Sequence, residues 1–220
     1  MTSPVLRRGL ADEAADRIRD AIFEGHFPPG ATLREVELAA SLGVSRGSVR
    51  EGLTRLEHEG LIRTIWHRGT RVVDVTAADV GEVYTLRAAL DRLAATTAHH
   101  AATSQQLAGL DALVTEMAAA VAAGVTGAQL VALDMAFHEA VYAAAGNTRL
   151  HEAWRALRSQ VHLFQLRRVT VGAAHYRDRV ITEHRELAEL IREGDQETLA
   201  AVAEEHVHAA RRALLADLPA

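Results

Sequence analysis

Two short helical patterns joined at a glycine place the tightest constraint on the fold of this chain. The first pattern opens at Thr32-Leu33-Arg34-Glu35, which has the spacing of a capping box, and it ends near Gly43. Ser45 is a good N-cap for a second helix from Arg46 to about His58, and Gly60 ends that helix. Two helices separated by so short a turn are typical of a helix-turn-helix.

The residues around this pair complete a larger motif. An apolar stripe predicts a preceding helix from about Ala11 to Glu24. After the pair, Leu61–Ile65 and Thr70–Val73 have the composition of short strands, and residues 66–69 join them as a hairpin. Three helices followed by a hairpin predict a winged helix-turn-helix domain over residues 8–75.

The rest of the chain has the composition of packed helices. Aromatic residues make up only 4% of the sequence, and alanine fills many of the apolar positions, which disfavours a β-sandwich. Caps and glycine breaks predict about six helices, over residues 76–101, 104–123, 126–146, 148–169, 174–193 and 195–216. We therefore expect a mainly α protein, in which an all-α antiparallel bundle over residues 76–220 follows the winged domain.

Charge and cysteine content narrow the class of protein. The net charge is −5, but residues 1–75 carry 11 arginines and 11 acidic residues, so the surplus acid lies in the second domain. No lysine is present, and arginine favours bidentate contacts to phosphate and guanine. Without cysteine there is neither a disulfide framework nor a thiolate metal site. The sequence has no apolar leader or membrane span, so we expect a cytoplasmic protein without membrane contacts.

The second helix of the pair has the features of a DNA recognition helix. Arg46 and Arg50 are four residues apart, hence on one face of its first turns, where recognition helices meet base edges. The alternative is a solvated face on which Arg50 pairs with an acid such as Glu51. The complete helix–glycine–helix–hairpin context favours DNA contact, and the expected contact residues are Ser45, Arg46, Gly47, Ser48, Arg50, His67, Arg68 and Gly69.

The segment FPPGATLREVELAASLGVSRGSVREGLTRLEHEGLI resembles the GntR superfamily of bacterial regulators. The elements "PPG", "ELA", "LGVSR", "VRE–L–RLE–EGL" and a following "RG" occur in order over most of residues 10–75. The resemblance implies DNA contacts by Arg46, Arg50 and the wing around Gly69. The chain departs from the family pattern in two places. Val36 stands where some members have arginine, and Gly47 and Ser48 stand where "TP" is frequent, so operator preference is expected to differ.

A polar pair interrupts the most apolar helix of the second domain. The helix over Gln129–Ala145 is apolar nearly all round, which predicts a central position in its bundle. Asp134 and His138 lie on one face of it, four residues apart. A buried carboxylate is costly unless it is paired or bound to a metal.

Two later histidines are expected to face the same interior. His184 shares a helical stripe with apolar residues, and so does His206, whereas His208 falls on the opposite, charged side of its helix. Together with Asp134 and His138, these inward imidazoles form a suitable ligand set for Zn²⁺ or a similar divalent ion. The residues alone leave a second interpretation open, in which the acid and histidine are a hydrogen-bonded pair and the other histidines belong to the core.

An all-helical domain after such a head is similar to the FadR-type branch of the superfamily, in the form called FCD. The resemblance implies a metal site, because metal-binding FCD domains use an Asp–x3–His followed by two histidines on the last helices. Asp134, His138, His184 and His206 match that order. Arg87 matches an arginine that holds a ligand carboxylate in such domains, whereas without the resemblance it would be an exposed pair with Asp91.

The sequence thus predicts a ligand-responsive DNA-binding regulator, and a repressor rather than an activator. We expect a homodimer on a two-fold symmetric double-stranded operator, with a small carboxylate effector, such as a hydroxy or sugar acid, at the metal and Arg87. An alternative is a metal-dependent hydrolase or other metalloenzyme that uses the same site, but no further buried base or nucleophile is evident for it. A third possibility is a sensor whose histidines contact the ligand without metal.

Overall fold

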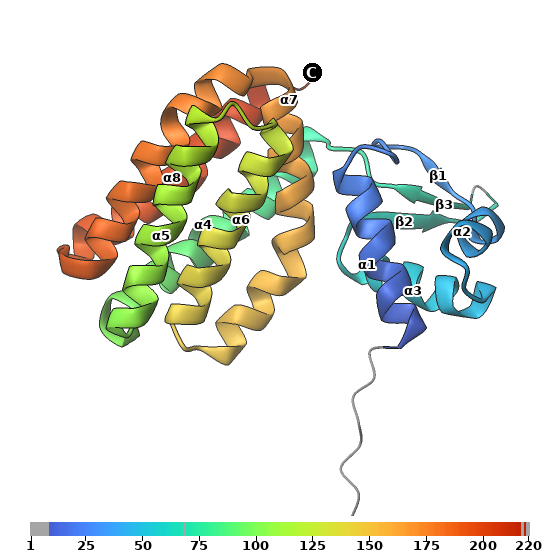
Figure 1. Cartoon of the computed structure of the whole chain (residues 1–220), viewed down its shortest axis with the longest axis horizontal. Helices are drawn as coiled ribbons and strands as arrows, with labels where there is room; N and C mark the ends of the chain where they lie inside the picture. The colour runs from blue at the N-terminus through green and yellow to red at the C-terminus, as the bar shows by residue number, and fades with distance from the viewer. Residues whose placement is uncertain (1–8, 68, 217, 219–220) are drawn as a thin grey trace, which may run out of the picture. The chain divides into compact units, whose positions relative to one another are not determined.

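The computed structural model describes residues 9–67, 69–216 and 218, without the side chains of residues 171–175 and 178. The chain forms two compact units, Met1–Asp74 and Val75–Ala220 (Figure 1). No helix in the described ranges is long and apolar enough to cross a membrane.

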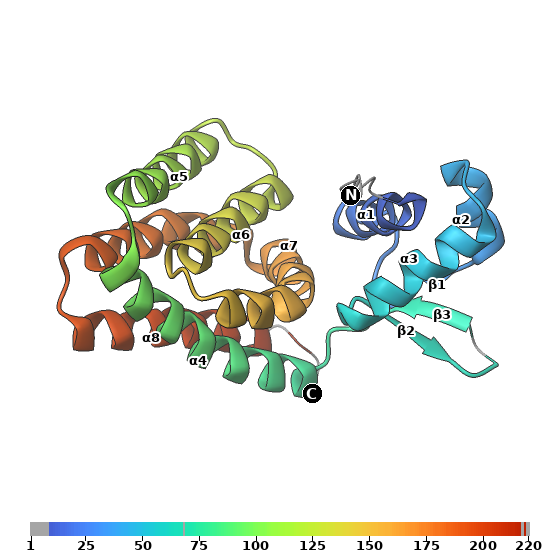
Figure 2. The ribbon, with the colours of Figure 1, turned by 90° about the horizontal axis from the view of Figure 1, so that it is seen from below.

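The first unit is the winged helix-turn-helix that the sequence predicts. Three helices are followed by a hairpin whose second strand, β3, also pairs with a short early strand, β1, so the sheet order is β1-β3-β2 (Figure 2). The elements are α1 (Leu10–Phe23), β1 (Thr32–Leu33), α2 (Glu35–Leu42), α3 (Arg46–His58), β2 (Ile62–Ile65) and β3 (Gly69–Val72).

The capping box expected at Thr32 is wrong. Thr32 pairs with Arg71 and Leu33 pairs with Thr70, so both residues belong to β1. The N-cap of α2 is Arg34, whose side chain makes no capping hydrogen bond. Leu33 is only 3% exposed, because the pairing with β3 turns its side chain into the core. Burial and strand pairing, both tertiary effects, therefore override the local cap.

The turn between α2 and α3 follows the sequence closely. Gly43 has φ 67°, a left-handed conformation that glycine adopts without strain. Ser45 caps α3 by accepting a hydrogen bond from the Ser48 backbone N–H at 3.1 Å. The first residues of α3 are therefore held in a defined position relative to α2.

The second unit is an all-helical bundle in which α6 lies between α5 and α7, and α4 runs beside α8 (Figures 1 and 2). Threonines cap three of its helices, at Thr76, Thr103 and Thr126. The central position predicted for the apolar helix α6 is confirmed. The helices are α4 (Ala77–Ala101), α5 (Ser104–Ala122), α6 (Gly127–Ala144), α7 (Thr148–Glu193) and α8 (Gln196–Ala216).

The break expected between residues 169 and 174 is absent, and one helix, α7, replaces the two that were predicted. The described part of this unit therefore has five helices rather than about six. Yet Gln165 and His184, both in α7, each lie within 3.3 Å of a carboxylate oxygen of Asp134. A straight helix would hold residues 19 apart at about 28 Å. The helix therefore bends back on itself between them, in a stretch that contains Gly172, while its backbone hydrogen bonding continues.

Helices α1 and α3 approach closely at Gly52. A Cβ atom at this position would lie 3.0 Å from the Ala11 carbonyl oxygen and 3.1 Å from the Ala15 nitrogen. We expect Gly52→Ala to lower the free energy of unfolding by about 1–3 kcal/mol, because the backbone of α1 must move. The measurement is urea denaturation followed by circular dichroism.

Gly47→Ala is the matched control for this variant, since Gly47 lies in the same helix and a Cβ there would meet only Ser45 Oγ, at 3.5 Å. It should leave stability unchanged or raise it by up to about 1 kcal/mol. Equal stabilities of the two variants would contradict the close contact at Gly52.

Candidate functional sites

Four buried side chains meet inside the second unit. Helix α6 supplies Asp134 and His138, α7 supplies His184, and α8 supplies His206. One ligand atom from each side chain lies within 4.8 Å of those of the other three. All four residues are less than 9% exposed. The structure thus brings together the acid and the three inward histidines singled out in the sequence, and His208 is partly exposed beside Glu204.

His184 and Asp134 face each other with acceptor atoms. The Nδ1 atom of His184 lies 2.6 Å from the Val180 carbonyl oxygen, which only accepts, so Nδ1 carries a proton. In the neutral ring the Nε2 atom then carries a lone pair and no proton. It lies 2.9 Å from Asp134 Oδ1 without a hydrogen bond of good geometry. Two acceptors at this distance need a cation between them, or an extra proton on the histidine. A histidine oriented through its other nitrogen is a common arrangement for metal ligands.

His138 is oriented in a similar way. Its Nδ1 atom lies 3.4 Å from Asp91 Oδ2, and its Nε2 atom lies 2.9 Å from Arg87 Nη2. Because arginine only donates, His138 Nε2 accepts that hydrogen bond. The same lone pair is the one that a metal ion would use. Burial lowers the pKa of His138 well below its usual value, and the Arg87 charge lowers it further, so this ring is neutral.

His206 completes the cluster beside Glu183, which was not predicted as a site residue. Its Nδ1 atom lies 3.2 Å from Glu183 Oε2, again without hydrogen-bond geometry. Burial lowers the pKa of His206, and Glu183 only partly opposes this effect. Glu183 is half-buried and also pairs with Arg179. Its position directly before His184 was the one hint in the sequence.

The charge of Asp134 is strongly stabilised. Burial alone would raise the pKa of this carboxyl, but His184, His138 and Arg87 outweigh burial and hold the pKa far below its usual range. Gln165 Nε2 donates to the second oxygen of Asp134 at 3.3 Å. An ionised carboxylate and three imidazoles, two of them with buried nitrogens that lack a hydrogen bond, fit the needs of a divalent metal ion.

Arg87 lies at the same site and is fully buried. The expected alternative, an exposed pair with Asp91, is wrong about exposure, because Arg87 is 0% and Asp91 6% exposed. The pair itself exists, with Arg87 Nε 3.2 Å from Asp91 Oδ2, and Tyr142 donates to the other oxygen of Asp91 at 2.6 Å. Asp91 and Tyr142 were not predicted as site residues, although Asp91 stands one helical turn after Arg87.

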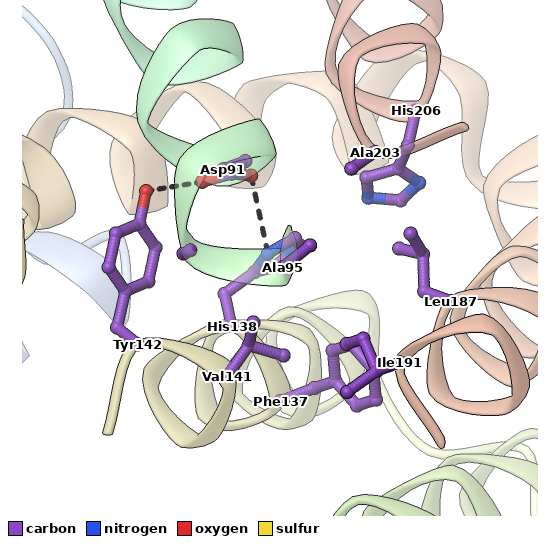
Figure 3. A pocket seen from close by; sticks show the side chains of 11 residues that line it. Asp91, Ala95, Phe137, His138, Val141, Tyr142, Leu187, Ile191, Ala203 and His206 are labelled. Atoms are coloured by element: carbon purple, nitrogen blue, oxygen red, sulfur yellow. Dashed lines mark hydrogen bonds and ion pairs between the residues drawn. The ribbon is translucent and has the colours of Figure 1, made fainter. Parts of the chain in front are cut away.

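A small cavity of about 20 Å³ adjoins this cluster. Figure 3 shows its side chains converging from several helices, with Asp91 linked to both Tyr142 and His138. Most of the wall is apolar, and polar groups are confined to a few positions near the histidines. The lining residues are Asp91, Ala94, Ala95, Phe137, His138, Val141, Tyr142, Leu187, Ile191, Ala203 and His206.

On the first unit, the two arginines predicted to contact DNA are exposed at the start of α3. The side chains of Arg46 and Arg50 are 63% and 64% exposed. Arg50 pairs with Glu35 of α2 rather than with Glu51, through Nε and Nη2 at 3.0 and 2.8 Å. The hydrogen bonds from Arg50 lower the pKa of Glu35. Ser45 and Gly47 are exposed beside these arginines, and Ser48 is half-buried.

The wing tip carries an unusual backbone conformation. His67 has φ 60°, in the left-handed region that residues other than glycine rarely adopt, and Gly69 has φ 75°. His67 and Gly69 are exposed. Trp66, which was not predicted as a site residue, is 85% exposed and packs edge-on against the His67 ring. Arg68 lies outside the described residues.

Comparison with protein families matches both parts of the chain. Residues 10–72 match the family described as "Bacterial regulatory proteins, gntR family". Residues 82–209 match the FCD domain.

Individual relatives agree with these matches. A probable D-xylose utilization operon transcriptional repressor of Paenarthrobacter nicotinovorans is 36% identical over 70% of this chain and 68% of its own length. The HTH-type transcriptional regulator YdhC of Bacillus subtilis, itself uncharacterised, is 28% identical over 87% of this chain and 83% of its own. The structure of E. coli McbR/YncC, 22% identical, superposes with a TM-score of 0.81 over 94% of this chain and 98% of its own, which shows a shared fold.

The buried cluster generates a prediction for metal binding. We expect the parent protein to bind one Zn²⁺ per chain, and His184→Ala to weaken that binding by more than the roughly 10–100-fold typical of changes to outer-shell partners. Affinity should fall as the pH is lowered, because protons compete for the same histidine nitrogens. Elemental analysis and chelator competition measure both effects.

His208→Ala is the control for this experiment, because His208 lies on the same helix as His206 but is partly exposed and pairs with Glu204. It should bind zinc like the parent. Equal zinc content in the parent, His184→Ala and His208→Ala proteins would contradict a site formed by this cluster.

Proposed function

The chain belongs to the GntR family of bacterial transcriptional regulators and carries an FCD domain, and from this premise we propose that it is a metal-dependent repressor that senses a small carboxylate. In the proposal, a homodimer in the cytoplasm binds a two-fold symmetric operator and releases it when the effector binds. Family and relatives are regulators rather than enzymes, and nothing favours the metalloenzyme alternative.

The observation that carries the proposal is the buried cluster of Asp134, His138, His184 and His206 beside the buried Arg87. These four residues would hold the metal, and zinc suits three imidazoles and one carboxylate. When bound, the metal supplies a Lewis acid that attracts a carboxylate oxygen. Arg87 adds a guanidinium whose Nη1 atom has no hydrogen-bond partner in the protein, and it would orient the same carboxylate.

The position of Arg87 in the chain suggests how the effector would act on DNA binding. Arg87 and Asp91 belong to α4, which begins at Ala77, and the last wing strand ends at Val72. Only residues 73–76 connect the two elements. A ligand that binds Arg87 therefore contacts the helix that directly follows the wing in sequence. A shift of α4 between two arrangements would couple effector and operator binding.

The proposed DNA contacts come from α3 and the wing. Arg46 and Arg50 would read base edges or phosphates, with Ser45, Gly47 and Ser48 at the start of the helix and His67, Arg68 and Gly69 at the wing. Arg50 is held by Glu35 in the free protein, so DNA must replace that carboxylate. An exposed pair of this kind contributes about 0–1 kcal/mol, so the exchange costs little.

The proposed homodimer has a candidate surface on α4. Leu86 and Leu93 are 50% and 49% exposed, and their spacing of seven residues puts them on one face of the helix. Ala89 and Thr96 line a shallow groove beside Leu93. Exposed leucines on one stripe favour packing against a second helix.

The proposed DNA contacts predict that operator affinity falls when one arginine of α3 is removed. Arg46→Ala should weaken operator binding by about 1–3 kcal/mol, roughly 5–150-fold, and relax base preference. Anisotropy titration measures this on a duplex selected from a random library by the parent protein. Arg17→Ala is the control, because Arg17 is similarly exposed on α1 but pairs with Glu13 of the same helix. Unchanged affinity of Arg46→Ala would remove Arg46 from the base-reading set.

The sensing half predicts that metal and carboxylate act together. In a thermal-shift screen of small carboxylates, an effector at 100 times its Kd should add about 2.7 kcal/mol of stability, or roughly 5–10 °C in Tm, when zinc is present. The same acid should give a much smaller shift after chelator treatment. A full shift without zinc would instead support a sensor whose histidines contact the ligand directly.

A further inference from the structure

A second group of buried polar side chains lies near the cluster of Asp134, His138, His184 and His206 and has no role in the proposed function. The hydroxyls of Tyr84 and Tyr176 and the Nη1 atom of Arg87 are buried without a hydrogen-bond partner in the protein. Arg168 is 6% exposed and forms no ion pair with a carboxylate of the described residues, although its charge contributes to lowering the pKa of Glu183. A buried cation without a paired anion is costly, and unpaired buried donors are rare.

These donors belong to one neighbourhood. The Arg87 guanidinium carbon lies 5.6 Å from the centre of the Tyr84 ring, and that of Arg168 lies 5.1 Å from the centre of the Tyr176 ring. Burial raises the pKa of both tyrosines, and the charges of both arginines oppose this rise at each of them, which agrees with the two ring contacts.

A single glutamine connects this group to the metal cluster. Arg168 Nη1 donates to Gln165 Oε1 at 3.4 Å, and Gln165 Nε2 donates to Asp134 Oδ2 at 3.3 Å. The side-chain amide of Gln165 therefore bridges Arg168 and the Asp134 carboxylate. A short molecule bound at Arg87 and the metal would reach Arg168.

The buried charges indicate what such a molecule should carry. The described buried ions are Arg87 and Arg168, with Asp91 and Asp134, so the cations and anions are equal in number. A divalent metal held by neutral histidines would leave two positive charges in excess. Glu183 does not remove this excess, because it is half-buried and pairs with Arg179. A ligand with two negative charges would neutralise the site, whereas a monocarboxylate would leave one charge unmatched.

We propose that the effector is a short dicarboxylate, with one carboxylate at Arg87 and the metal and the other at Arg168 and the hydroxyls of Tyr84 and Tyr176. This proposal rests on the proposed function, since it concerns the same sensing domain. It narrows the effector from any small carboxylate to acids with two ionised groups. In this proposal Arg168 contacts the effector directly and determines which acids bind, instead of only holding Gln165 in position.

The test is isothermal titration calorimetry of the full-length, zinc-loaded protein with matched acids. Succinate and malate are compared with butyrate and 3-hydroxybutyrate, which have the same chain length and one carboxylate fewer. The parent should bind the better dicarboxylate at least tenfold more tightly than its monocarboxylate partner. Arg168→Met should abolish that preference and leave monocarboxylate affinity within about twofold, since only one charge-assisted contact is lost.

Arg167→Met is the matched control, because Arg167 is the neighbouring arginine and is exposed. It should retain the parent's preference. Tyr176→Phe removes only a hydroxyl and should reduce the preference several-fold, so it tests the site even when Arg168→Met does not fold. The readout is the ratio of the two affinities, which a merely structural role of Arg168 would leave unchanged.

Three results would overturn the proposal. If the parent bound both classes of acid with equal affinity, there would be no second anion-binding subsite, but the proposed carboxylate sensor would still stand. A second such result is that Arg168→Met weakens the binding of both classes of acid to the same extent, while Tyr176→Phe leaves the ratio of the two affinities unchanged. Arg168 would then only hold Gln165 in position and would not contact the effector. Binding of neither class by the zinc-loaded parent would overturn the proposed carboxylate sensor together with this inference.

Discussion

The second unit depends on one constraint, the burial of the Asp134 carboxylate in the middle of an apolar bundle. An ionised acid that is 1% exposed must be surrounded by positive charge and hydrogen-bond donors. The bundle supplies them from its other helices, with His184 and Gln165 on α7 and Arg87 on α4. The same groups that stabilise this charge are the ones that would hold the proposed metal and the effector carboxylate.

The bend in α7 makes this arrangement possible. Because α7 turns back between Gln165 and His184, one helix approaches both oxygens of the same carboxylate. A straight helix would have left one of these positions to another element. The second half of α7 also contributes Leu187 and Ile191 to the cavity wall, so the bend shapes the pocket as well as the ligand set.

The first unit has no net charge that would attract DNA. It carries equal numbers of arginines and acidic residues, so its attraction to DNA has to come from the position of its charges. Arg46 and Arg50 are exposed at the start of α3, and Glu35 holds Arg50 in a defined place. If Arg50 contacts DNA as proposed, an acid at this position would limit binding to DNA in general, because only a ligand that replaces Glu35 would gain the full contact. Glu35 would therefore favour specific over non-specific binding.

The sequence by itself determined the elements whose signals are local. The Ser45 cap, the turn at Gly43, the hairpin, and the inward phase of His138, His184 and His206 all follow from spacing, because helical periodicity and capping act within a few residues. Tertiary structure decided what depends on distant partners. Pairing with β3 turned Thr32 and Leu33 into a strand, and packing carried α7 through an expected break. Burial decided between the two expectations for Arg87, a ligand-holding arginine or an exposed pair with Asp91, in favour of a buried cation. Folding alone linked Arg168 to Asp134 through Gln165, since no local pattern encodes which helices meet.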